Sequence, residues 1–429
     1  MERVFLRKSS RVLGLPPEAT VWSRVYSLVI FLLVTLSCLH VLYKSGLEPL
    51  LDRRSDVTLS IAYIFDFMAR TARVISYIIM HLLTYKHAGE FDKIYQILVS
   101  TKYRVTGDLS KRNNDAILFT VVLAMIRVMV ALGRVVFRST GQPVSLLNTF
   151  ITMPFHLKFI FNFYMELQLF TLCSELDHSF DSISHRLKQL RKNCTSNSIT
   201  DSGLVLVDKW RLPMMQQLSL HTTYLASYAS TVRNLRRAHS TLSSLTAKVN
   251  ALFGVRLLVD VTAQLTALLL RLKIIIIWIF SVLSPNAERV NEFANAIELE
   301  RAASALVLCP VHIGTVYAVV YFCTRTVKKN DLILAEVHKL LNHSLEEDNR
   351  QELQIFAMQL SQRKVQFTAA GVMPLDFSLL YSFMGVVTTY LVILIQFGAS
   401  VPRYANNDSK LCVDLLKNFL INATAPTSN

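Results

Sequence analysis

The sequence predicts an all-α, polytopic membrane protein with seven transmembrane helices. The first observation is composition: of 429 residues, 52% are hydrophobic and 17% are charged, and the mean hydropathy is +0.38. Soluble domains have about 25% charged residues. The second observation is that the apolar residues are gathered in runs long enough to cross a bilayer. The third is that the polar segments between these runs keep a helical period.

Each predicted span is an apolar run that a polar segment ends. The first follows a basic leader but is too long for the apolar part of a signal peptide, so we expect it to be retained. The fourth is interrupted by Pro154, and the fifth is so long that part of it should leave the bilayer. The runs cover residues 25–42, 59–84, 116–137, 146–172, 249–283, 302–323 and 373–397.

Two long polar segments separate the later spans, and their apolar residues recur at helical spacing. The first should form two long helices joined by a loop at 193–203, and both segments should extend the bundle beyond the membrane. The predicted division of the chain is 1–24, N-terminal segment; 25–173, spans one to four; 174–247, first helical segment; 248–324, spans five and six; 325–372, second helical segment; 373–397, span seven; and 398–429, C-terminal tail.

The distribution of basic residues predicts the orientation in the membrane. The side that holds the N-terminus and both long segments carries about 28 Lys and Arg, against about 9 on the other side. We therefore expect a cytoplasmic N-terminus, cytoplasmic helix extensions and an extracellular C-terminus. The glycosylation sequons at Asn407 and Asn422 would then be usable. The net charge of +15 is explained by cytoplasmic segments, and no basic soluble domain is available to bind nucleic acid.

No enzyme chemistry is indicated. The chain has no metalloprotease, P-loop, nucleophile-elbow or dinucleotide motif, so we expect no catalytic residues and no cofactor. Its six cysteines show no paired metal spacing, and most fall in or beside apolar runs, where cysteine is a small apolar residue. We expect neither a metal site nor a disulfide framework.

Span seven carries its polar residues on one face. At 100° per residue, the stripe comprises Ser378, Ser382, Gly385, Thr389 and Gln396. Such a stripe either packs tightly against another helix or lines a wet path. The residues alone leave both readings open.

Several spans contain ionisable residues, which are costly in lipid and need a partner or a function. Most can be explained by structural pairing. A subset in the predicted outer halves could instead line a cavity for a polar or mixed small molecule. These pocket candidates are Tyr63, Asp66, Arg70, Arg127, His156, Trp278 and His312.

The end of span seven reads Thr389-Tyr390, five apolar residues, then Gln396-Phe397. Upstream, residues 367–371 read Phe-Thr-Ala-Ala-Gly, and Asp376 precedes the span. This stretch closely resembles the end of insect gustatory receptors, which are related to insect odorant receptors. The resemblance implies a tetrameric, ligand-gated, non-selective cation channel. Four copies of span seven would line the pore, residues 325–372 would belong to a cytoplasmic anchor region, and a tastant would bind in the outer half of each subunit.

Carried over by position, the resemblance places Phe397 at an outer gate as an apolar constriction and Gln396 beside it as a polar neighbour. Thr389 and Tyr390 would lie about two turns deeper, with Ser382 further along the same pore helix. An apolar ring can close a pore by dewetting, and rotation toward Gln396 would wet it. This chain departs from many members, which end almost at once after this position, in its tail of about 30 residues after Phe397.

The resemblance also implies partners and a location. We expect a small-molecule tastant, membrane lipid, permeant cations, and either a homotetramer or a heteromer with other gustatory receptors. The location would be the plasma membrane of chemosensory neurons. The alternative function is a metabotropic, G-protein-coupled chemoreceptor, which the predicted orientation and the lack of a coupling motif disfavour. A transporter would show inverted repeats, and none is evident.

Overall fold

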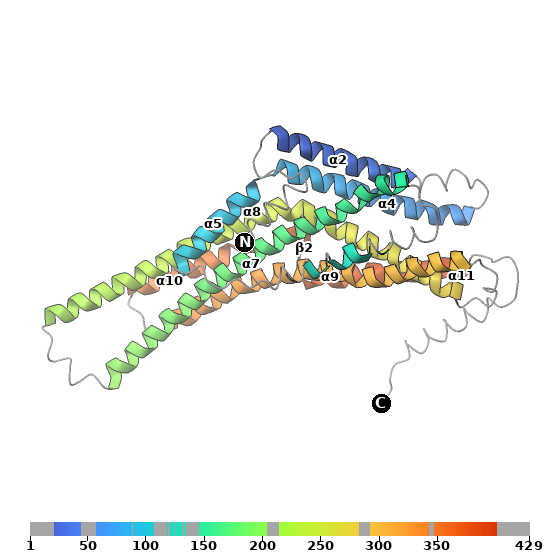
Figure 1. Cartoon of the computed structure of the whole chain (residues 1–429). Coiled ribbons are helices and arrows are strands. Elements are labelled where there is room, and N and C mark those ends of the chain that lie inside the picture. The colour runs from blue at the N-terminus through green and yellow to red at the C-terminus, as the bar shows by residue number, and fades with distance from the viewer. Residues whose placement is uncertain are drawn as a thin grey trace, which may run out of the picture.

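The computed structural model describes residues 21–43, 57–87, 89–106, 118, 121–123, 125–130, 133, 146–203, 214–282, 292–342 and 347–400. The predicted glycosylation sites, Asn407 and Asn422, lie outside these residues. The described chain forms an elongated bundle of helices (Figure 1). The helices are α2 (Val21–Leu42), α4 (Val57–Lys86), α5 (Glu90–Thr106), α7 (Leu146–Gly203), α8 (Met214–Val282), α9 (Glu292–Leu341), α10 (Glu347–Gln362) and α11 (Phe377–Ser400).

The predicted all-α class is confirmed, with one small addition. Strands β1 (Thr368–Ala369) and β2 (Met373–Pro374) pair antiparallel between α10 and α11. The apolar run that begins at Met373 therefore enters its helix only at Phe377. The second predicted helical segment likewise ends in this hairpin rather than in helix.

Three helices are far longer than a bilayer requires. Helices α7, α8 and α9 have 58, 69 and 50 residues. At about 1.5 Å per residue they span roughly 75–100 Å, whereas a hydrocarbon core is about 30 Å thick. In Figure 1, part of each helix runs toward one end of the molecule, where α5 and α10 accompany them.

Two described segments are long and apolar enough to cross a membrane, Tyr228–Ile279 and Leu299–Leu341. Shorter apolar helices occupy Leu28–Leu42, Val121–Val130 and Phe377–Ile393. These segments fall on predicted spans one, three, five, six and seven. The number of spans and their orientation stay predictions at this point.

Two sequence expectations about α7 are wrong. Residues 193–203 do not form a loop, because α7 continues through them to Gly203. Asn, Ser and Thr cost only a few tenths of a kcal/mol each in a helix, which does not suffice to end one. Pro154 does not interrupt the helix either, since it lies within the first three turns of α7.

The part of the bundle beyond the predicted spans is here called the distal bundle. It comprises α5, α10, residues 174–203 of α7, residues 214–247 of α8 and residues 325–341 of α9. Its apolar core is completely buried and draws on five helices. The fully buried side chains include Leu98, Leu176, Phe180, Ile183, Leu187, Leu242, Ile333, Leu353 and Phe356.

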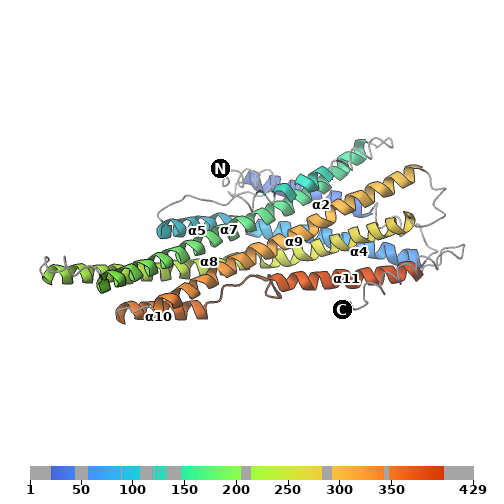
Figure 2. The same ribbon diagram turned by 90° about the horizontal axis from the view of Figure 1, so that it is seen from below.

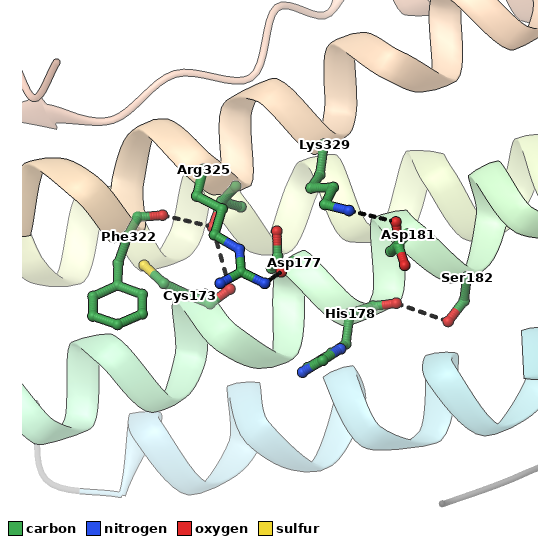
Figure 3. A network of polar contacts seen from close by, with 9 residues as sticks. Cys173, Asp177, His178, Asp181, Ser182, Phe322, Arg325 and Lys329 are labelled. Carbon is green, nitrogen blue, oxygen red and sulfur yellow. Dashed lines mark hydrogen bonds and ion pairs between the residues drawn. The ribbon is translucent and has the colours of Figure 1, made fainter. Parts of the chain in front are cut away.

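Charged pairs fix the register of α7 against α9 (Figure 3). The Arg325 guanidinium lies 3.1 Å from a carboxylate oxygen of Asp177, and Lys329 Nζ lies 2.6 Å from Asp181 Oδ1. The second pair lies four residues after the first on each helix, so α7 and α9 keep the same register over one helical turn. Between α5 and α7, Lys102 Nζ lies 3.2 Å from Glu175 Oε2, with both side chains less than a tenth exposed.

Candidate functional site

Helix α11 packs against the rest of the chain along one narrow face. Leu379, Phe383 and Val387 recur every four residues and are buried. Phe383 and Val387 lie in one apolar cluster with Leu268 of α8 and Cys309 and Val316 of α9. Figure 2 shows α11 along the edge of the bundle, beside α8 and α9.

The predicted polar stripe lies on the opposite, exposed side of α11. Ser378, Ser382, Gly385, Thr389 and Gln396 are all exposed within the chain. A Cβ atom added to Gly385 would meet nothing within 4 Å. The small residues of the stripe are therefore not needed for close helix packing inside this subunit. This excludes the explanation that the stripe serves to pack α11 against another helix of the same chain.

The residues proposed for the gate lie near the C-terminal end of α11. Gln396 is exposed and Tyr390 is half-buried, while the Phe397 side chain lies outside the described residues. Thr389 Oγ1 donates a hydrogen bond of 2.9 Å to the Gly385 carbonyl oxygen. Because this hydroxyl is satisfied by its own helix, Thr389 can face either an apolar surface or water.

The N-terminal end of α11 is held by a helix cap. The backbone N–H of Ser378 donates to Asp376 Oδ1 at 2.9 Å, and the Ser378 hydroxyl also donates to that oxygen. Asp376 therefore acts as the N-cap of the helix, a position that carboxylates stabilise. The Phe377 ring lies 6.4 Å from the Tyr317 ring and 5.8 Å from Lys328 Nζ, both on α9.

A buried polar network joins four helical segments among the predicted spans. Arg127 lies 3.5 Å from Glu166 Oε1 of α7 and donates to Thr315 Oγ1 of α9 at 2.6 Å. Arg127 and Glu166 are each more than nine-tenths buried. An arginine buried among apolar helices is costly unless paired, so this pair favours the structural explanation of both charges.

The same network continues on α8. Gln264 Nε2 donates to Asp260 Oδ1 at 3.1 Å, and the Gln264 carbonyl oxygen lies 2.7 Å from His312 Nδ1. Asp260 also interacts electrostatically with Arg127 and Glu166. Charges from α7, α8 and the segment around Arg127 therefore converge on one place.

Of the seven pocket candidates, the structure brings Arg127 and His312 into this network. Arg70 and Trp278 are half-buried elsewhere on α4 and α8. The side chains of Tyr63, Asp66 and His156 lie outside the described residues. Sequence reasoning did not select Gln264 or Thr315, although the spacing of Asp260 and Gln264, one helical turn apart, was a usable signal.

Polar groups outside the spans show how burial acts in the distal bundle. Burial raises the pKa of Asp177 above its usual value, and the Arg325 guanidinium opposes this shift. Burial also lowers the pKa of His178, and Lys102 acts in the same direction. Within the described part of the chain, no three His, Cys, Asp or Glu side chains form a group that could hold a metal ion.

Comparison with known proteins shows which family has this architecture. The model of the family described as "7tm Chemosensory receptor" matches residues 9–400. Drosophila melanogaster proteins named as putative gustatory receptors 28b and 28a are 24% identical over 208 residues and 41% identical over 86 residues. These matches cover 48% and 20% of this chain, and 43% and 19% of the relatives, so the chain matches less than half the length of each.

Solved structures agree on the fold. The insect olfactory receptor OR5 from Machilis hrabei in complex with eugenol superposes with a TM-score of 0.54 at 12% identity, covering 92% of this chain and 98% of that chain. A second structure of OR5 from Machilis hrabei gives a TM-score of 0.53 at 11% identity, covering 92% of this chain and 97% of that chain. At such identities the likeness concerns the fold alone. Because the family model spans nearly the whole chain, this protein belongs to the 7tm chemosensory receptor family, which is a family of membrane receptors and not of enzymes.

Proposed function

We propose that this receptor is a gustatory-type, ligand-gated, non-selective cation channel assembled from four subunits and opened by an extracellular small molecule. The observation that carries the proposal is the exposed polar stripe of α11. Lipid offers Ser, Thr and Gln side chains no hydrogen-bonding partner beyond those of their own chain, so a continuous polar stripe is favoured at an aqueous surface over one that faces lipid. Copies of α11 around a central axis would instead turn these residues toward a shared aqueous path.

The faces of α11 agree with this arrangement. Its buried face packs on α8 and α9 of the same chain, which leaves the opposite face for the axis. Other exposed positions carry large apolar side chains such as Met384 and Val386, which suit lipid or a neighbouring subunit. Gln396 would lie at the outer gate, and Phe397 remains the proposed apolar constriction.

The ligand would bind within the outer half of each subunit. The pocket candidates keep this proposed role, with Arg127 and His312 acting through the buried network that joins α7, α8 and α9. Partners in the assembly would be identical copies or other gustatory receptors. The site of action would be the plasma membrane of chemosensory neurons, with the C-terminus outside and Asn407 and Asn422 available for glycosylation.

Current recorded after expression of this chain alone tests the proposal. In cells with G-protein signalling blocked, a panel of sugars, bitter compounds and amines should evoke a cation current from at least one compound class. A response that disappears when G-protein signalling is blocked would support the metabotropic alternative instead. A C-terminal tag reached by antibody only after permeabilisation would contradict the proposed orientation.

The same recording tests the gate. Replacing Gln396 by Ala should change the ion permeability or the open probability, because the polar neighbour of the constriction is lost. Met384→Ala is the matched control, since Met384 is exposed on α11 away from the polar stripe. Equal currents in Gln396→Ala and in the parent protein would remove Gln396 from the gate.

A further inference from the structure

The β-hairpin before α11 is built on an uncommon turn. Ala370 and Gly371 both have positive φ, at 54° and 74°, and the Val372 N–H donates to the Ala369 carbonyl oxygen at 2.9 Å. Two left-handed residues inside an i to i+3 hydrogen bond define a type I′ turn. Alanine rarely adopts this backbone conformation, so the surroundings must hold it there.

Helix α8 supplies those surroundings through Asn250. The Thr368 N–H donates to Asn250 Oδ1 at 2.8 Å, and Asn250 Nδ2 donates to Thr368 Oγ1 at 3.1 Å. One side chain of α8 thus holds both the backbone and the side chain of the first strand. In Figure 2 the segment between α10 and α11 passes along α8.

One turn further along α8, Gly254 meets the hairpin backbone directly. A Cβ atom at this position would lie 3.2 Å from the Ala370 nitrogen and 3.4 Å from the Thr368 carbonyl oxygen. Backbone atoms in a tight turn cannot yield as the end of a flexible side chain can. Asn250 and Gly254 share one face of α8, so together they fix both the position and the depth of the hairpin.

The linker between the hairpin and α11 is very short. Only Leu375 and Asp376 separate β2 from the first residue of the helix. The Leu375 N–H donates to the Phe367 carbonyl oxygen at 3.0 Å, and its side chain is buried. Asp376 then caps the helix. A displacement of the hairpin must therefore displace the start of α11.

Beyond the hairpin, α8 is tied to the helices that carry the pocket candidates. Arg256 Nη2 donates to the Leu83 carbonyl oxygen near the end of α4 at 2.7 Å, and Gln264 lies 2.7 Å from His312 of α9. These contacts fall within four turns of Asn250 on the same helix. Because α8 is one continuous helix, a rotation or shift of the part near His312 would also move the part near Asn250.

We propose that the docked hairpin couples α8 to α11, with Asn250 and Gly254 as positioning residues that set where the pore helix begins. Movement of α8 on ligand binding is passed to α11 through Thr368 and the two linking residues. This coupling rests on the proposed function for its consequence in gating. The mechanical link itself is a property of the described contacts and can be tested separately.

The test places a reporter thiol on the exposed stripe of α11 in the full-length chain. Ser382→Cys is made in the parent protein and labelled with a maleimide that shifts the band on a gel, and labelling at 382 is read as the shift beyond that given by the six native cysteines of the parent. Gly254→Ala should change the labelling rate of Cys at 382 by about fivefold or more, the lower end of typical coupling between sites. The matched control is Gly314→Ala, whose Cβ would meet only the flexible Leu123 Cδ2 at 3.8 Å; it should leave the rate within about twofold, below that range.

A second pair of variants keeps the test decisive if Gly254→Ala does not fold. Asn250→Ala removes both bonds to Thr368 and should change the labelling rate in the same direction as Gly254→Ala. Asn250→Asp keeps an acceptor for the Thr368 N–H and for its hydroxyl, so it should restore the parent rate. A structural role alone would not produce this rescue at a site on another helix.

Equal labelling rates across the parent, Gly254→Ala and Asn250→Ala would overturn the coupling. A current measured on the same cells separates this outcome from failure of the channel proposal. If labelling at 382 never alters a membrane current while the rates still follow the hairpin variants, the coupling stands and the pore role of α11 fails.

Discussion

The distal bundle and α11 use their surfaces in opposite ways. In the distal bundle, apolar side chains from five helices are fully buried, and charges that face one another are paired between helices. In α11, one row of three apolar residues is buried, and a polar row is exposed. A single subunit thus completes its core in the distal bundle but leaves a chemically specific face of α11 uncovered. The region that completes the hydrophobic core is therefore separate from the region proposed to conduct ions.

The largest expected effect lies in the distal core. Phe356 of α10 is fully buried, and its ring centroid lies 5.8 Å from that of His239. Phe356→Ala should destabilise the protein by about 3–5 kcal/mol through lost burial and the cavity that remains. Thermal unfolding of the purified protein in detergent measures this. Tyr381→Ala on α11, at a residue that is 80% exposed, should change stability by less than about 0.5 kcal/mol; equal losses would contradict the comparison.

Removing one partner of a buried ion pair should cause a smaller loss of stability. Lys102→Met leaves the Glu175 carboxylate, only 6% exposed, without its lysine, which should cost about 3 kcal/mol. The double variant Lys102→Met/Glu175→Leu should recover most of the loss in the same unfolding assay, because no unpaired charge then stays buried. Lys329→Met removes a lysine of the same kind from an exposed pair and should cost less than about 1 kcal/mol.

Replacing the residue that caps the start of α11 should cost less stability than either of these changes. Asp376→Ala removes the acceptor for the Ser378 N–H and should cost about 1 kcal/mol, whereas Asp376→Asn retains a good cap and should cost little. Hydrogen exchange in the first turn of α11 reports this locally. Protection that is identical in all three proteins would show that the cap does not hold the helix start.

The smallest effect is a dependence on pH. Because burial raises the pKa of Asp177, its folded form holds a proton more tightly than its unfolded form. The contribution of this group to stability is therefore fully present below its unfolded pKa and is lost as pH rises through the folded pKa. As pH rises from below the unfolded pKa of Asp177 through its folded pKa, the stability of Asp177→Asn relative to the parent should therefore rise. A relative stability that falls over this range would contradict the assigned cause.

The sequence predicted the faces of α11 better than it predicted the buried polar network of α7, α8 and α9. The polar stripe needs only helical periodicity, so Ser382 and Thr389 were placed correctly on one face. The all-helical class followed from the same periodicity. The bonds of Gln264 with His312 depend on how two helices are rotated against one another, which one sequence does not reveal.

The hairpin escaped prediction for a related reason. Its strands have two residues each, too few for an alternating pattern, and its turn carries Ala370 where Asn would be the usual signal. The predicted loop at 193–203 failed in the opposite sense, because polar composition was taken as a helix end when no breaking residue follows until Gly203. The hairpin is therefore decided by tertiary packing, whereas the helix at 193–203 follows from backbone propensities that polar composition alone does not reveal.

We propose that the exposed polar face of α11 lines the ion path, and thiol modification during current recording is the sharpest test of this role. A charged methanethiosulfonate should alter the current through Thr389→Cys, which is exposed, and leave that through Val387→Cys, which is 4% exposed, unchanged. Modification at 389 that leaves the current unaltered, with the reaction verified by mass spectrometry, would contradict the account.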